Sequence, residues 1–248
     1  MFVTAWALVV ADAARAGAVA LAVLLGQLSI GWGNDALDAA RDATAGRNDK
    51  PVAAGQVGVR TVATAAGLAL VACVPASLAL GLRPGAVHLI AVASGWSYNL
   101  GVKRGPLSPL PYALSFGLLP AVVAPPPVAV ALAAALLGVA AHFANTVPDA
   151  EADALTGVRG LPQRLGPQHS LHVAAGCLAV AALCLLTTPG APGLAQVRVV
   201  VLGLGAAVGL GVAVVGPRLG RRAFVGVLVA VALVIAGYLT SASDSSSI

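Results

Sequence analysis

The chain has 248 residues, of which 59% are hydrophobic and only 9% charged, and its formal net charge is +5. Soluble domains carry about 25% charged residues, so this composition excludes a water-soluble fold. Long apolar stretches recur instead, without the alternation of apolar and polar residues that barrel strands require, which indicates a polytopic helical membrane protein.

These apolar stretches predict the membrane helices in chain order. We expect spans near 16–33, 60–81, 86–101, 110–124, 127–144, 169–188, 196–215 and 222–240. A further apolar piece at 2–11 covers roughly half of a ~30 Å hydrocarbon core, and we interpret it as the truncated first helix of nine. The whole is expected to form a single transmembrane domain over residues 1–240, followed by a polar, disordered tail at 241–248.

The basic residues collect on alternate connections, after the second, fourth, sixth and eighth predicted helices. Short cytoplasmic loops of membrane proteins collect Lys and Arg, so this face is expected to be cytoplasmic. The 14 basic residues are spread over a membrane-sized apolar surface and form no basic domain, so we expect a bilayer and no nucleic acid as partner.

Acidic residues concentrate in two windows on that same predicted face. The first holds Asp35, Asp38, Asp42 and Asp49, and the second holds Asp149, Glu151 and Asp153. Asn34, Asp38 and Asp42 are spaced four apart, which places them on one stripe of a helix, and Asp149 and Asp153 repeat that step.

Two facing acidic stripes without local compensation would repel each other near a low-dielectric boundary, so we expect a bound cation. Mg²⁺ fits, because it takes hard oxygen ligands and is held by a few carboxylates together with substrate phosphates. The expected ligands are Asn34, Asp35, Asp38, Asp42, Asp149 and Asp153. Two such Mg²⁺ ions would allow the two acidic clusters to hold one diphosphate between them. The nearby basic residues expected to bind its remaining oxygens are Arg41, Arg47, Lys50, Lys103, Arg104 and Arg159.

Each of these assignments has an ordinary alternative. Acidic residues at helix ends are often solvated or interact with the helix dipole, and Asp49 and Glu151 fall off the four-residue step. Lys103 and Arg104 also fit plain determinants of membrane topology.

The two acidic motifs and the segment between them resemble those of the UbiA superfamily of intramembrane prenyltransferases. The first motif, N-x-x-x-D-x-x-x-D, is followed by RNDKPVAAGQV, and the second, D-x-x-x-D, by TGVRGLPQRLG. Between them, SYNLGVKRGPLSP is similar to the family's Tyr and Lys-Arg connection after the fourth helix. The resemblance covers most of the chain.

The resemblance implies an all-α bundle of nine transmembrane helices that transfers a prenyl group from a polyprenyl diphosphate to an aromatic or other small acceptor. It implies Mg²⁺ as the cofactor and Asp38, Asp42, Asp149 and Asp153 as the catalytic aspartates. Tyr98 and Asn99 are expected at the mouth of the substrate pocket, although they also fit an interfacial tyrosine and a helix-end asparagine.

Three other classes compete with this interpretation. A membrane terpene cyclase would use the same scaffold and quench the allylic cation within the substrate. A phosphatidyl-type alcohol transferase has one acidic motif with a different spacing. A cation or proton transporter should carry its acids in mid-span, whereas both motifs here lie at predicted helix ends. The acceptor and the length of the donor chain stay open.

Overall fold

The computed structural model describes residues 13–188, together with 203, 205, 209, 211, 225–227 and 229–232. This part of the chain is helical and contains no strand. Its elements are α2 (Ala13–Thr44), α3 (Val59–Leu78), α4 (Leu82–Asn99), the 3₁₀ turn η1 (Val102–Arg104), α5 (Leu110–Val123), α6 (Val128–Thr146), α7 (Ala150–Leu155) and α8 (Leu161–Leu186).

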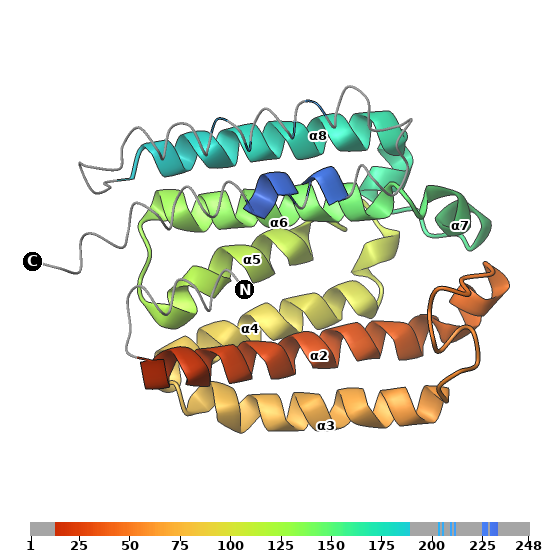
Figure 1. Cartoon of the computed structure of the whole chain (residues 1–248), viewed down its shortest axis with the longest axis horizontal. Coiled ribbons are helices and arrows are strands. Elements are labelled where there is room, and N and C mark those ends of the chain that lie inside the picture. Colours follow the sequence, from red (N-terminus) through yellow and green to blue (C-terminus); the bar gives the residue numbers. More distant parts are fainter. Residues whose placement is uncertain are drawn as a thin grey trace, which may run out of the picture.

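The long helices run side by side and form one bundle (Figure 1). Helix α2 packs against α3 and α4, while α5 lies between α4 and α6, and α6 packs against α8. The connection that follows α2 and the short helix α7 lie at the same end of the bundle (Figure 1). The segments that carry the two acidic motifs therefore meet there.

Four of the described helices are long and apolar enough to cross a membrane, namely Ala14–Thr44, Val59–Leu78, Val128–Thr146 and Leu161–Leu186. Helix α5 has 14 residues, which corresponds to about 21 Å at the rise of an α-helix and is shorter than a bilayer core. The predicted helix at 2–11 and the tail at 241–248 lie outside the described residues, as do nearly all of the predicted spans 196–215 and 222–240.

The predicted end of the first described span, at residue 33, is wrong, because α2 continues to Thr44. The acidic motif therefore extends this helix, in agreement with the helical stripe that its four-residue spacing predicts. Residues 34–44 are rich in Ala, and Arg41 forms an ion pair with Asp38 one turn away, which favours helix over loop. The helix stops just before Gly46, which adopts a positive φ of 68°.

The last described long helix also starts earlier than predicted, at Leu161 and not at 169. Two helical pieces meet there at a kink, where Gly166 has φ 81° and is followed by Pro167. Proline cannot continue the hydrogen bonds of the preceding turn, so the chain changes direction at this point. The first piece carries Gln163 toward the second acidic motif.

The core combines many buried Ala and Val residues with a few larger side chains. Phe143, Leu171 and Leu178 are buried between α6 and α8. Between α2 and α4, a Cβ atom placed on Gly33 would come within 2.5 Å of the Trp96 ring. Glycine is thus required for this contact, as is common where membrane helices pack tightly.

Candidate functional site

A cavity of about 380 Å³ opens inside the bundle where α2, α4, η1, α5, α6 and the segment leading into α7 come together. Its size lies in the range of small-molecule sites. It is lined by Gln27, Ile30, Gly31, Asn34, Asp38, Arg41, Arg47, Lys50, Gly95, Tyr98, Asn99, Lys103, Pro111, Tyr112, Ser115, Phe116, Asn145, Thr146, Asp149, Asp153 and Val158.

The acidic stripe of α2 faces this cavity over two of its three positions. Asn34 and Asp38 line it, and Asp42 lies one turn further along, where it is 3% exposed. Lys50 binds Asp42 through an Nζ to Oδ2 distance of 2.8 Å and also contacts Asp35 at 3.1 Å. Asp35 and Asp42 therefore do not line the cavity themselves, and both contact Lys50, which does.

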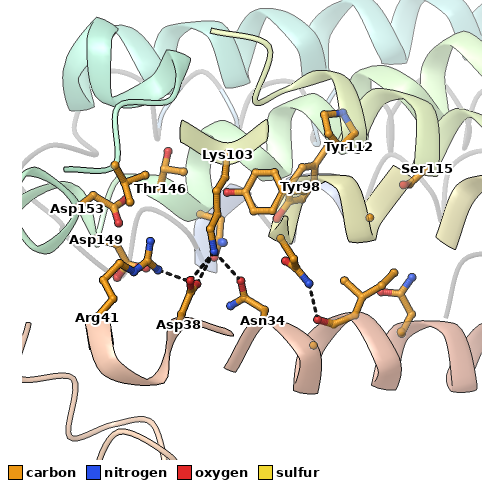
Figure 2. Close-up of a pocket in the computed structure, with 18 of the residues that line it drawn as sticks. Asn34, Asp38, Arg41, Tyr98, Lys103, Tyr112, Ser115, Thr146, Asp149 and Asp153 are labelled. Carbon is orange, nitrogen blue, oxygen red and sulfur yellow. Dashed lines mark hydrogen bonds and ion pairs between the residues drawn. The ribbon is translucent and has the colours of Figure 1, made fainter. Parts of the chain in front are cut away.

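Lys103 of η1 reaches across to α2. Its Nζ donates to both carboxylate oxygens of Asp38 at 2.6 Å and to Oδ1 of Asn34 at 3.3 Å (Figure 2). Burial lowers the pKa of Lys103, and the hydrogen bond to Asp38 acts in the opposite direction without reversing the shift. Arg41 contacts the same carboxylate at 2.8 Å.

The second acidic motif enters the cavity from the opposite side (Figure 2). Asp149 forms an ion pair of 2.9 Å with Arg47, which belongs to the connection after α2. Asp153 accepts a hydrogen bond of 2.7 Å from Nε2 of Gln163. Burial raises the pKa of Asp153, while the hydrogen bond from Gln163 acts to lower it.

The sequence-based argument that these carboxylates lack local compensation is wrong. Asp38, Asp42 and Asp149 each contact a Lys or Arg of the chain itself. The cations come from the same stripe, the following connection and η1, so only the tertiary fold brings the last of them within contact distance. An acidic site that is also lined by cations suits an anion that carries its own metal ions.

Tyr98 and Asn99, which the sequence predicts at the mouth of a substrate pocket, both line the cavity at the end of α4. Asn99 donates from Nδ2 to the backbone oxygen of Ile30 at 2.8 Å, which ties α4 to α2. The rings of Tyr98 and Tyr112 meet edge to face, with centroids 5.2 Å apart. These two tyrosine rings lie beside Lys103, at the border of the charged end of the cavity (Figure 2).

Two of the basic residues expected to bind substrate are not brought into the cavity lining. Arg104 follows Lys103 but is exposed, and Arg159 is exposed as well. The backbone oxygen of Arg159 accepts a hydrogen bond from Nε of Arg164 at 2.8 Å. Their assignment as substrate-binding residues remains a prediction.

Several lining residues were missed by sequence reasoning. Gln27, Ser115 and Phe116 lie toward the end of the cavity away from the aspartates, and Gln163 holds Asp153 from outside the lining. Gln27 carried a usable signal, because an amide inside an apolar span is costly unless it faces a cavity. Ser115 and Phe116 carried none, since both are ordinary in a membrane helix.

The donor chemistry of the site fits Mg²⁺. Carboxylate and amide oxygens of Asn34, Asp38, Asp149 and Asp153 all face one cavity, as a hard cation requires. Among the described residues, however, no three Asp, Glu, His or Cys side chains are gathered closely enough to hold a metal ion. Lysine, arginine and glutamine side chains contact these carboxylates in this structure.

Comparison with known proteins identifies one family. Residues 1–224 match the model of the UbiA prenyltransferase family. No curated protein sequence matches the chain significantly.

Solved structures of low sequence identity share the fold. The apo structure of a UbiA homolog from Aeropyrum pernix K1 has a TM-score of 0.77 at 20% identity, covering 96% of this chain and 94% of that one. A UbiA homolog from Archaeoglobus fulgidus bound to GPP and Mg²⁺ has a TM-score of 0.67 at 17% identity, covering 98% and 95%. A digeranylgeranylglyceryl phosphate synthase has a TM-score of 0.68 at 15% identity, covering 98% and 92%.

Proposed function

Because this chain belongs to the UbiA prenyltransferase family, we propose that it transfers a prenyl group from a polyprenyl diphosphate to an aromatic or other small acceptor within the membrane. The observation that carries the proposal is the division of the cavity into two ends. Asn34, Asp38, Asp149 and Asp153 meet four basic side chains at one end, and the other end is uncharged among the described lining residues. A prenyl diphosphate likewise has a charged diphosphate at one end and an uncharged hydrocarbon chain at the other.

The charged end is suited to binding and activating a diphosphate. Arg41, Arg47, Lys50 and Lys103 would donate to its oxygens and stabilise the negative charge that develops as the bond from C1 to oxygen breaks. Asn34, Asp38, Asp149 and Asp153 would hold Mg²⁺, with Asp35 and Asp42 supporting them through Lys50. When bound, the metal supplies Lewis acidity that makes diphosphate a better leaving group.

The remainder of the cavity is suited to the allylic cation and the acceptor. The faces of Tyr98 and Tyr112 can stabilise a passing positive charge, and the apolar lining excludes water that would quench it. The acceptor's nucleophilic atom then bonds to C1 and loses a proton. A homolog bound to GPP and Mg²⁺ supports the choice of donor and cofactor for this chain.

The membrane orientation belongs to the same proposal. The connection after α2, η1 and the segment around α7 hold Arg47, Lys50, Lys103 and Arg159, and the first and last of these segments lie at one end of the bundle (Figure 1). We place this end at the cytoplasmic face, since short cytoplasmic loops are rich in Lys and Arg.

Release of diphosphate from labelled prenyl diphosphates by the detergent-purified full chain tests the proposed activity. We expect the release to depend on Mg²⁺ and to increase when candidate acceptors are added. The Asp38→Ala and Asp149→Ala variants should release no diphosphate. Thr44→Ala, at the exposed end of the same helix, is the control and should behave like the wild type.

The competing functions give different outcomes. Release without any acceptor, accompanied by a cyclised hydrocarbon or alcohol, would identify a membrane terpene cyclase. No release from dimethylallyl, geranyl, geranylgeranyl or longer donors would contradict the proposal and favour a transporter that uses the same carboxylates.

A further inference from the structure

The position of Lys103 is unusual for a residue expected to bind substrate. Its side chain is 4% exposed, and its Nζ donates to three oxygens, one of Asn34 and two of Asp38. These are oxygens that the expected Mg²⁺ would use. In this structure, the Lys103 ammonium therefore contacts the two side chains that would hold the metal.

The neighbouring carboxylates are held in the same way. Lys50 contacts Asp42 at 2.8 Å, and Arg47 contacts Asp149 at 2.9 Å. Like-charged carboxylates that converge at a cavity raise each other's free energy, and the chain relieves this repulsion with its own cations. The site is nearly neutral before any ligand binds.

Neutralisation of this kind has a consequence for metal binding. A divalent ion that enters alone must separate the ammonium from Asp38 and leave a buried lysine without a partner, which is strongly unfavourable. A diphosphate that enters with the metal provides oxygen acceptors for that ammonium. The four-carbon lysine side chain is flexible enough to turn from the carboxylate to a ligand in the same cavity.

We propose that Lys103 is an exchangeable internal counterion, which holds Asn34 and Asp38 together in the empty site and transfers to the diphosphate when the metal–diphosphate complex binds. Metal and diphosphate then bind cooperatively, and free Mg²⁺ binds weakly. This inference rests on the proposed function, because it takes the donor to be a prenyl diphosphate.

Removal of the charge on Lys103 tests the exchange directly. The first probe is Mn²⁺ alone, whose binding is measured from the electron paramagnetic resonance signal of the free ion. The second probe is geranyl S-thiolodiphosphate, a poorly reactive analogue of the donor, in the presence of Mg²⁺. Mn²⁺ is a suitable probe because oxygen sites that bind Mg²⁺ also bind Mn²⁺. Both are measured on the detergent-purified full chain.

Lys103→Met should change the two affinities in opposite directions. We expect the variant to bind Mn²⁺ about tenfold more tightly than the wild type, which corresponds to the loss of about 1.4 kcal/mol of competition from the ammonium. We expect its affinity for the analogue to fall by about tenfold or more. Lys103→Arg keeps the charge and should retain weak Mn²⁺ binding. Arg60→Met removes an exposed cation from the start of α3 and should leave both affinities unchanged.

Unchanged or weaker Mn²⁺ binding by Lys103→Met would overturn the inference, because an ammonium that competes with the metal for Asp38 must lower metal affinity while it is present. Asp38 keeps its 2.8 Å contact with Arg41 in this variant, so the fold is expected to survive. Lys103→Gln makes the same measurement if the methionine variant does not purify as a monodisperse protein. Absence of prenyl transfer by the wild type, with the opposite shifts intact, would count against the proposed function alone.

Discussion

The carboxylates of the two acidic motifs contact different kinds of side chain, some charged and one neutral. Asp38 contacts Lys103 and Arg41, and Asp149 contacts Arg47, whereas Asp153 is held by the neutral Gln163. Neutral hydrogen bonding orients a carboxylate without cancelling its charge. Asp153 is therefore the carboxylate among these three that has no basic side chain as its contact partner.

This difference predicts a positioning role for Gln163. Gln163→Leu removes the 2.7 Å hydrogen bond to Asp153, and side chains that orient ligands typically affect metal affinity or activity by about 10- to 100-fold. We expect the Mg²⁺ concentration for half-maximal diphosphate release to rise about tenfold. Gln168→Leu, on the exposed face of the same helix, is the control, and an equal effect in both variants would contradict this role.

At the scale of single elements, α2 combines an apolar segment long enough to span a membrane with the acidic stripe of the first motif. It runs from Ala13 to Thr44 without interruption, so the orientation of Asn34 and Asp38 follows from how the membrane part packs. Gly33 immediately precedes the motif and lies against Trp96 of α4. The packing of α2 against α4 at Gly33 therefore affects the position of Asn34, the first residue of the acidic motif.

A side chain at Gly33 should separate α2 from α4. Gly33→Ala places a Cβ 2.5 Å from the Trp96 ring, and overpacking of this kind typically lowers the free energy of unfolding by about 1–3 kcal/mol. Gly67→Ala on α3 meets open space and should leave stability unchanged or raise it, because alanine favours helix. Thermal unfolding in detergent compares the two, and equal melting temperatures would refute the close contact.

At the scale of the whole molecule, the bundle creates a cavity that no single helix contains. Its charged end is built from α2, η1 and the segment around α7, and its uncharged end from α2, α4 and α5. The four apolar helices and the family identify an integral membrane protein. A donor bound with its diphosphate at the charged end would extend its chain toward Ser115 and Phe116.

This arrangement predicts that the uncharged end controls the length of the donor. Ser115→Phe narrows the uncharged end of the cavity. We expect kcat/KM for geranylgeranyl diphosphate to fall about tenfold relative to kcat/KM for dimethylallyl diphosphate, because added bulk in an apolar pocket excludes the longer chain. Ala93→Phe adds the same ring at an exposed position of α4 and is the control. An equal loss for both donors would show that the chain lies elsewhere.

The sequence by itself determined the membrane class, the helical architecture and the residues of both acidic motifs, because apolar span length and four-residue spacing are local properties of a helix. It also predicted Tyr98, Asn99 and Lys103 beside them through the family resemblance. Only the tertiary structure decided that Lys103 binds Asp38, that Arg47 binds Asp149 and that Asp42 is withdrawn from the cavity. These contacts join segments far apart in the chain, and they depend on how closely the helices pack, which spacing along one helix does not encode.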